Sequence, residues 1–142
     1  MDGFLYAASV HQRYLSAAIL SAQSLREHYA GASITLVTEP RFFFDGLYDT
    51  FDDVIIGPPN QKRLKLWGIC NSLYDRTLYI DADSEIQHPD IAIVHDQLGD
   101  ADIMLSKIRP YRAAYTKFPG GELTDHCGII LYKGTGKVKR HM

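Results

Sequence analysis

The sequence predicts an α/β fold in which helices flank a mostly parallel central sheet. Strand-like apolar runs alternate with segments of helical periodicity in units of about 30 residues, as in strand–helix–strand crossovers. The first of these runs, residues 4–10, is almost continuously apolar, which is typical of a strand buried on both faces. With 142 residues, 46% of them apolar, the chain is long enough to bury the core of one domain.

The first half of the chain predicts a long helix between strands. Apolar residues recur at helical spacing over residues 12–29, and we expect Gly31 to end this helix in the left-handed conformation that glycine tolerates. Residues 34–38 and 51–56 are rich in β-branched and aromatic side chains and predict two further strands. The segment between them, residues 40–48, predicts a loop or a short helix.

The second half continues the alternation with shorter elements. Residues 62–73 predict a helix. Its expected core contacts are Leu64, Trp67, Ile69 and Cys70. Pro89 suits the first position of a short helix that continues to Leu98. Further strands are expected at residues 78–80, 101–106 and 127–132, with a loop at 109–124. We therefore expect a single domain over residues 3–133, followed by a basic tail at 134–142.

Composition and charge exclude several classes of function. Fifteen basic and seventeen acidic residues give a net charge of −2, which does not indicate nucleic-acid binding. No apolar run approaches the ~18 residues that span a bilayer, so we expect no transmembrane segment. The N-terminus lacks a basic region before an apolar core, so we expect no signal peptide. Cys70 and Cys127 form neither a disulfide framework nor a metal-binding spacing, and we expect reduced thiols in a cytoplasmic protein.

Two carboxylates follow the apolar strand at residues 78–80. Successive strand side chains point to opposite faces, so Asp81 and Asp83 should project to the same side. They repel each other unless a cation lies between them, and oxygen ligands suit Mg²⁺ or Mn²⁺, commonly shared with substrate phosphates. The Asp-Ala-Asp triplet alone also fits a solvated turn capped by an aspartate.

The position of these aspartates in the predicted sheet favours the metal site. Ligands of parallel sheets bind beyond the carboxyl ends of the strands. Asp81 and Asp83 lie at such an end, and Ser9 and Thr38 follow two other predicted strands. Polar residues that are far apart in sequence should therefore meet at one edge, where a phosphate-bearing substrate would bind.

The segment around this motif resembles a known family. Lys65 in the preceding helix, Ser-Leu-Tyr-Asp at residues 72–75 and Thr-Leu-Tyr-Ile-Asp-Ala-Asp at residues 77–83 are similar to the DXD signature of nucleotide-sugar glycosyltransferases of the GT-A fold. The branch that it resembles is the family-eight-like, glycogenin/galactosyltransferase type. Weaker similarities in the outer segments extend the resemblance over residues 3–133. The fold that it implies is a Rossmann-like GT-A fold.

The resemblance implies a transferase that moves a sugar from a nucleoside-diphosphate sugar, most commonly a UDP-sugar, to a hydroxyl-bearing acceptor. It places Mn²⁺ or Mg²⁺ on Asp81 and Asp83, where the cation bridges the diphosphate. The implied donor-binding residues are Ala7, Ser9, Tyr14, Thr38, Lys65, Asp81, Ala82 and Asp83. Tyr14 would stack on the base, Thr38 and the adjacent Glu39 would touch the base or ribose, and Lys65 would reach the phosphates. A buried helix-face Tyr14 and a solvated Lys65 are the competing interpretations.

The sequence departs from the family pattern in its last third. His126-Cys127-Gly128 stands where Asn-x-Gly is usual, which makes His126 a further candidate metal ligand. The family's His-x-x-Gly-x-x-Lys segment has no match here, so the chain looks short at its C-terminal end. The resemblance favours retention of configuration. An inverting enzyme instead needs a carboxylate base beside the acceptor, for which Glu122 and Asp125 are candidates.

Two other functions compete with glycosyl transfer. The chain fits a non-catalytic nucleotide-sugar-binding remnant, since that would share the fold and the metal site. It also partly fits a phosphatase of the haloacid-dehalogenase type, whose nucleophile motif is an apolar strand followed by Asp-x-Asp-x-Thr. Here Glu85 replaces that threonine, and the motif follows three earlier strands where it normally follows the first. The sequence does not specify which sugar is transferred, which acceptor receives it or whether the chain forms a homo-oligomer.

Overall fold

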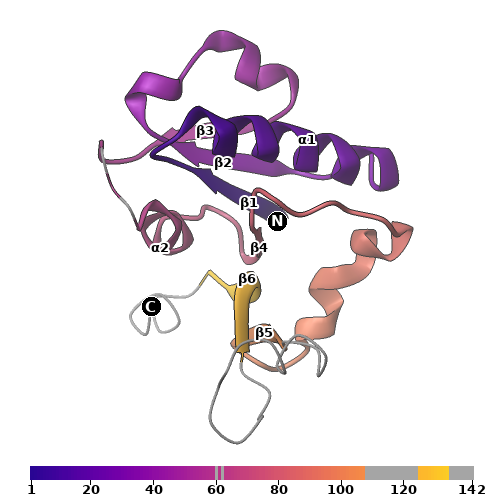
Figure 1. Cartoon of the computed structure of the whole chain (residues 1–142). Coiled ribbons are helices and arrows are strands. Elements are labelled where there is room, and N and C mark those ends of the chain that lie inside the picture. The colour runs from indigo at the N-terminus through magenta and orange to yellow at the C-terminus, as the bar shows by residue number, and fades with distance from the viewer. Residues whose placement is uncertain (60, 62, 108–124, 135–142) are drawn as a thin grey trace, which may run out of the picture.

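The computed structural model describes residues 1–59, 61, 63–107 and 125–134, and within these the chain forms one sheet (Figure 1). The sheet has six strands in the order β3-β2-β1-β4-β6-β5. The strands are β1 (Asp2–Ala8), β2 (Ile34–Thr38), β3 (Asp53–Ile56), β4 (Arg76–Ile80), β5 (Ile103–Lys107) and β6 (Asp125–Lys133). Each overlaps a predicted strand, which confirms the α/β prediction.

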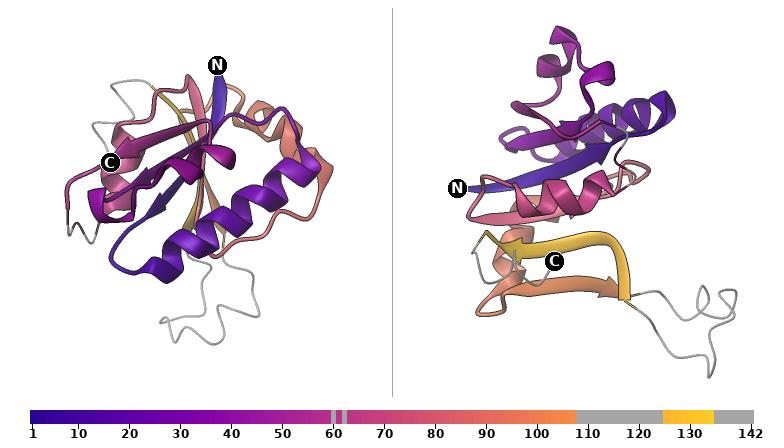
Figure 2. Two further views of the ribbon diagram at one scale, coloured as in Figure 1. Left: turned by 90° about the horizontal axis from the view of Figure 1, so that it is seen from above. Right: turned by 90° about the vertical axis from the view of Figure 1, so that its left-hand side faces the viewer.

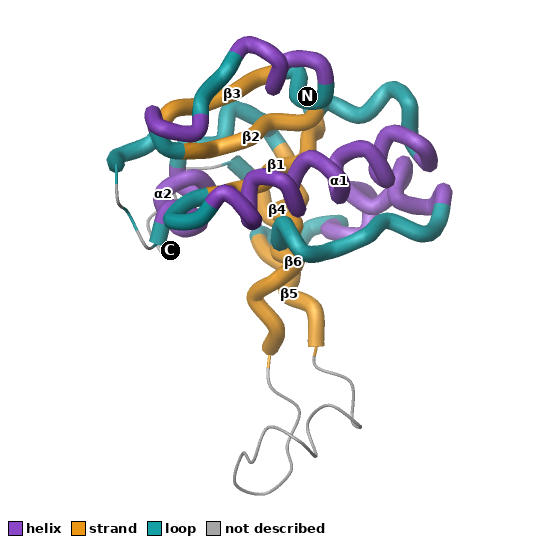
Figure 3. Tube along the Cα trace, turned by 45° about the horizontal axis from the view of Figure 1, so that its top comes forward, coloured by secondary structure: helices purple, strands orange, loops and turns teal. Residues whose placement is uncertain are grey.

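The sheet is parallel apart from one strand. β1 pairs in parallel with both β2 and β4, and β2 pairs in parallel with β3. β6 is antiparallel to both β4 and β5, so β5 has the same direction as the first four strands. The β5–β6 pair forms one end of the sheet, far from β3 (Figures 2 and 3).

Helices cover both faces of the sheet. The helix α1 (Gln12–His28) and the 3-10 segment η3 (Pro89–Leu98) lie on one face, and the helix α2 (Leu64–Cys70) lies on the other (Figure 2). Alternate residues of β1 therefore enter different cores. Phe4 and Tyr6 pack with Leu25 of α1, whereas Leu5 packs with Leu64 and Ile69 of α2. This double burial explains why residues 4–8 lack the apolar–polar alternation of a half-exposed strand.

The connections differ in detail from the sequence prediction. The segment predicted as a loop or short helix, residues 40–48, coincides with two 3-10 segments, η1 (Pro40–Phe42) and η2 (Asp45–Asp49). The end of α1 is a correction, because Gly31 does not adopt a left-handed conformation. Tyr29 ends the helix in a non-helical conformation (φ −147°, ψ 86°), and its N–H donates to the carbonyl of Leu25 at 2.8 Å.

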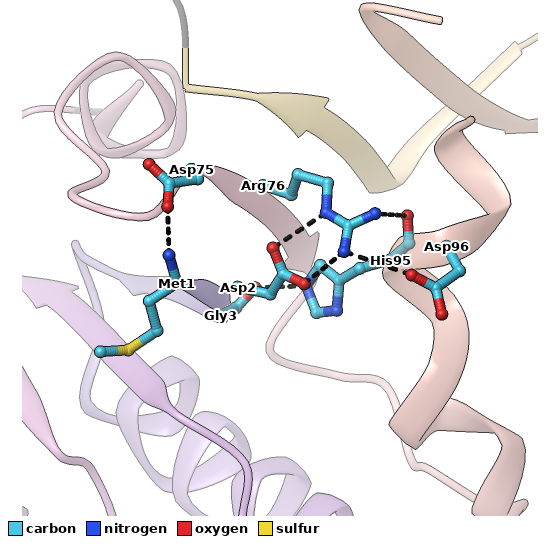
Figure 4. A network of polar contacts seen from close by, with 7 residues as sticks. All are labelled: Met1, Asp2, Gly3, Asp75, Arg76, His95 and Asp96. Atoms are coloured by element: carbon cyan, nitrogen blue, oxygen red, sulfur yellow. Dashed lines mark hydrogen bonds and ion pairs between the residues drawn. The ribbon is translucent and has the colours of Figure 1, made fainter. Parts of the chain in front are cut away.

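A polar network joins β1, β4 and η3 where β1 and β4 begin (Figure 4). The guanidinium of Arg76 donates to both carboxylate oxygens of Asp2, at 2.9 and 2.6 Å. It also donates to the carbonyl of His95 at 3.1 Å and to Asp96 at 3.2 Å. The His95 ring bonds the carbonyl of Gly3 at 2.8 Å. The network holds η3 against this end of the sheet.

Replacing Asp2 with asparagine is expected to weaken the response of the fold to acid. The hydrogen bonds from Arg76 hold the pKa of Asp2 below its ordinary value of 3.8. Because the unfolded chain then binds the proton more tightly, this contribution to stability is complete above pH 3.8 and is lost as the pH falls through the lowered pKa. The free energy of unfolding, measured in urea between about pH 5 and pH 2, should therefore fall less steeply in Asp2→Asn than in the wild type. Equal slopes would contradict this role.

Candidate functional site

A cleft of about 380 Å³ opens at the carboxyl ends of β1 and β4. Its walls are Ala7, Ser9, Val10, Tyr14, Tyr79, Asp81, Ala82 and Asp83. The structure thus brings together most of the donor-binding residues expected from the sequence, including both aspartates. Val10 and Tyr79 are lining residues that the sequence reasoning missed as site residues.

The two aspartates reach the cleft by a route different from the one predicted. β4 ends at Ile80, so strand alternation does not extend to Asp83. The N–H of Asp81 donates to the carbonyl of Gly128 in β6 at 2.8 Å, and the N–H of Ser84 donates to the carbonyl of Asp81 at 3.1 Å. The second bond closes a turn over residues 81–84. A turn, and not a continuing strand, therefore carries Asp83 to the cleft that Asp81 lines.

Asp81 is held by two side chains from different elements. The hydroxyl of Tyr79 donates to Asp81 Oδ1 at 2.8 Å, and Lys65 Nζ lies 3.4 Å from the same oxygen. Lys65 Nζ also lies 4.7 Å from the centre of the Tyr79 ring. Burial raises the pKa of Tyr79 well above its ordinary value, and the charges of Asp81 and Asp83 raise it further. Tyr79 therefore remains a hydrogen-bond donor that orients the Asp81 carboxylate.

On the sequence-based expectation that Asp81 holds Mn²⁺ beside a nucleotide, Tyr79→Phe should weaken Mn²⁺-dependent nucleotide binding about tenfold, because outer-shell partners that orient metal ligands commonly contribute that much. The free energy of unfolding should fall by about 1 kcal/mol, since the ring remains in place. Tyr132→Phe is the matched control: the Tyr132 hydroxyl is also buried and donates to the carbonyl of Ile69 at 2.8 Å, outside the cleft lining. Isothermal titration of UDP with Mn²⁺ separates the two variants. Equal affinities in both would show that Tyr79 does not orient Asp81.

Tyr14 lines the cleft from the start of α1. Its side chain is 41% exposed, which excludes the interpretation as a buried helix-face aromatic. The Arg13 guanidinium lies 5.0 Å from the centre of the Tyr14 ring and donates to the Tyr14 hydroxyl at 3.1 Å. An exposed ring steadied in this way can present a flat face to an aromatic ligand.

Two expected donor-binding residues lie outside the cleft lining. Thr38 is fully buried, and its hydroxyl donates to the carbonyl of Ala8 at 2.8 Å. It thereby holds the ends of β1 and β2 together behind the cleft. Lys65 contacts Asp81 from α2, and its side chain is only 28% exposed, so it is not a freely solvated lysine.

The candidates from the last third of the chain are only partly described. Asp125 and His126 belong to β6, whose Ile129 pairs with Ile80. Because β6 is antiparallel to β4, its first residues continue past the carboxyl end of β4, at the edge that bears the cleft. Only the backbone of Asp125 and His126 is described. Glu122 lies outside the described residues.

The chemistry of the cleft suits a hard divalent cation that is bound by the two carboxylates and by a substrate phosphate. Asp81 and Asp83 supply carboxylate oxygens, and Mg²⁺ in particular is commonly bound through one or two carboxylates plus substrate phosphates. Among the described residues, no group of three or more histidine, cysteine, aspartate or glutamate side chains gathers into a complete metal site. The donor set present therefore fits a cation whose remaining ligands come from substrate or water.

A second hollow, of about 440 Å³, lies between α1 and residues 83–85. It shares Asp83 with the cleft, and its other charged lining residues are Glu27 and Glu85. An all-acidic set of charged side chains repels a diphosphate. The charged residues that line the smaller cleft, Asp81 and Asp83, are acidic too, but Lys65 beside Asp81 supplies a positive charge there, so this cleft is the better phosphate site.

Comparison with known proteins establishes the fold. Neither family models nor curated protein sequences match the chain. Among solved structures, galactosyltransferase LgtC, in complex with donor and acceptor sugar analogues, matches with a TM-score of 0.60 and 16% identity over 100% of this chain and 60% of its own. Glycosyltransferase GlyE from Streptococcus pneumoniae TIGR4 matches with a TM-score of 0.67 and 16% identity, over 98% of this chain and 36% of its own.

A third similar structure is a synthetase and not a glycosyltransferase. CMP:2-keto-3-deoxy-manno-octonic acid synthetase, complexed with CTP, matches with a TM-score of 0.63 and 13% identity, over 99% of this chain and 76% of its own. No described helix is long and apolar enough to cross a membrane. The chain shares the Rossmann-like α/β fold of the two glycosyltransferases and the synthetase, and it spans 60% and 36% of the length of the two glycosyltransferases.

Proposed function

We propose that this chain binds a nucleoside-diphosphate sugar, preferentially a UDP-sugar, and transfers the sugar to a hydroxyl-bearing acceptor. The observation that carries the proposal is the meeting of Asp81, Asp83 and the exposed ring of Tyr14 around one cleft at the carboxyl ends of β1 and β4. The fold shared with LgtC and GlyE supports it. In this fold class such edges are where ligands bind.

Each side chain has a role in this proposal. Asp81 and Asp83 would hold Mn²⁺ or Mg²⁺, with His126 as a further candidate ligand, and a cation held there would supply positive charge to a departing diphosphate. Lys65, beside Asp81, contributes positive charge toward the phosphates. Tyr14 stacks on the base, while Ala7 and Ser9 allow the nucleotide to approach the end of β1. The resemblance favours retention of configuration. Asp125 and Glu122 are the carboxylates to test if configuration is inverted.

Titration of four ligands tests the proposal. UDP, UDP-glucose, UDP-galactose and GDP-mannose are titrated by calorimetry with Mn²⁺ and again with excess EDTA. We expect UDP and at least one UDP-sugar to bind with Mn²⁺ and to lose most of their affinity in EDTA. Hydrolysis of a simple phosphomonoester without nucleotide binding would contradict the proposal and favour the phosphatase alternative.

Turnover separates an enzyme from a binding module. Each donor that binds is incubated with the chain and a panel of hydroxyl acceptors, and released UDP is quantified. We expect release above the rate without protein, through transfer or through slow hydrolysis of the donor. Tight, metal-dependent binding with no release of UDP would favour the non-catalytic alternative.

A further inference from the structure

The backbone of Val10 is strained at the wall of the cleft. Val10 is the only non-glycine residue in the described part of the chain with a positive φ, 73°. The N–H of His11 donates to the carbonyl of Ser9 at 2.9 Å, so Val10 is the centre of a γ-turn. This is the rare, strained form of that turn, and a β-branched residue is especially unfavourable in it. Something outside the turn must therefore hold it.

Glu39 and Arg41, which follow β2, bind both polar backbone groups of Val10. Glu39 Oε2 accepts from the Val10 N–H at 2.6 Å, and Arg41 Nη2 donates to the Val10 carbonyl at 2.7 Å. Arg41 Nη2 also lies 3.3 Å from Glu39 Oε2. We call this arrangement the Glu39–Arg41 clamp. Both of its bonds to Val10 involve a charged group, which makes them stronger than neutral hydrogen bonds.

The carboxylate of Glu39 is fully buried, although it adjoins a strand end. Burying a carboxylate is costly unless partners compensate it, so its place beneath the loop needs a reason. Strained backbone persists where the surroundings over-determine it, and such residues cluster at ligand sites. Val10, Ser9 and Tyr14 all line the cleft. The clamp therefore acts on the wall that would receive the nucleotide.

We propose that Glu39 is a positioning residue: through Val10 it presets the Ser9–Tyr14 wall of the cleft for the nucleotide, without itself touching the ligand. The proposal rests on the proposed donor-binding function. Its physical basis is preorganisation, because a wall already held in its bound shape need not be ordered when the ligand binds. It also replaces the sequence-based expectation that Glu39 touches the base or ribose, since the buried carboxylate is directed at the backbone of Val10.

Glu39→Ala and Glu39→Gln test the clamp. Glu39→Ala removes the acceptor, whereas Glu39→Gln keeps an oxygen that can accept from Val10. We expect hydrogen exchange at the Val10 amide, followed by NMR, to accelerate at least about tenfold in Glu39→Ala, as loss of a bond to a charged group implies. The Kd for UDP with Mn²⁺ should rise about tenfold in Glu39→Ala and return to within about threefold of the wild type in Glu39→Gln.

Asp2→Ala is the control for general destabilisation. Asp2 belongs to the network at the start of β1, at the opposite end of that strand from the cleft. We expect Asp2→Ala to lower Tm while leaving both the Val10 exchange rate and the Kd for UDP unchanged. An equal loss of affinity in Asp2→Ala and Glu39→Ala would overturn the positioning role. So would an unchanged Val10 exchange rate in Glu39→Ala.

Val10→Gly gives a second test, which needs no measurement of UDP binding. Glycine adopts positive φ without strain, so loss of the clamp releases no backbone strain in this background. A double-mutant cycle on Tm should show that Glu39→Ala is more destabilising in the Val10→Gly background than in the wild type, where release of strain offsets part of the loss. Arg41→Ala, which removes the other bond to Val10, serves in its place if Glu39→Ala does not fold. Additive effects would overturn the proposal. If the wild type shows no Mn²⁺-dependent UDP binding, the proposed function fails, but exchange at Val10 and the cycle still decide whether Glu39 holds the turn.

Discussion

Replacing Asp81 and Asp83 together by alanine is expected to abolish Mn²⁺-dependent binding of UDP. The two residues are the carboxylates that line the cleft. Loss of an outer-shell partner alone commonly costs 10–100-fold in metal affinity, so removing both ligands should weaken binding by at least about 100-fold. Titration calorimetry with UDP and Mn²⁺ measures the effect. Circular dichroism checks that the double variant is folded.

Single substitutions refine this experiment. The Tyr79 hydroxyl donates to Asp81 at 2.8 Å, and Asp81→Asn keeps an oxygen that can accept this bond. A loss of UDP affinity in Asp81→Asn would therefore result from the lost charge more than from a displaced side chain. Asp83→Asn has a matched control in Glu85→Gln, because Glu85 is also exposed, lies two positions further along and loses the same charge. We expect Asp83→Asn to weaken binding and Glu85→Gln to change it less than about threefold. UDP binding that still needs Mn²⁺ in the double alanine variant would place the metal elsewhere.

Phe4→Ala is expected to have the largest effect on stability, with a loss of about 3–5 kcal/mol. Phe4 is 1% exposed in β1. Its ring contacts Tyr29 at the end of α1 and His95 in η3 edge-on, with centroids 6.1 and 4.9 Å apart. Truncation therefore leaves a cavity where the central strand meets both elements that cover this face.

Urea denaturation measures the cost, with Phe4→Leu as the control. Leucine fills most of the space, so its cost should be below about 2 kcal/mol. Native domains have only about 5–15 kcal/mol of stability, so Phe4→Ala should leave a detectable unfolded fraction on mild heating. A loss under about 1 kcal/mol for Phe4→Ala would mean that the junction of β1, α1 and η3 can collapse around the cavity.

The elements of the fold were predictable because their signals are local. The continuous apolar run of β1 and the helical spacing of α1 follow from the periods of strands and helices. The choice between helix types was not predictable: residues 89–98 form a helix as expected, but it is of the 3-10 type. The predicted bounds of α1, residues 12–29, agree with the structure, but the left-handed cap at Gly31 is wrong, because a glycine just past a helix permits, but does not require, such a cap.

The position of the candidate site in the fold was predictable, but the contacts within it were not. Parallel strands present their carboxyl ends at one edge, so Ser9 and Asp81 could be expected to meet there. The contacts of Tyr79 were not predictable, because its ring belongs to the core on the α2 face while its hydroxyl reaches Asp81. The strained turn at Val10 has no signal in sequence, since valine is among the residues least suited to it.

The sequence by itself determined the alternation of strands and helices and the α/β class, because both depend on side-chain periods along short stretches of chain. It also determined the edge of the sheet at which Asp81 and Asp83 lie, because the carboxyl ends of parallel strands meet at one edge. Only the tertiary structure decided that a turn carries Asp83 into the cleft, that Tyr79 and Lys65 hold Asp81, and that Glu39 and Arg41 hold Val10. These contacts join residues that are distant in sequence or depend on the direction of one side chain. Such distances and directions are fixed by packing the whole chain, and no local pattern encodes them.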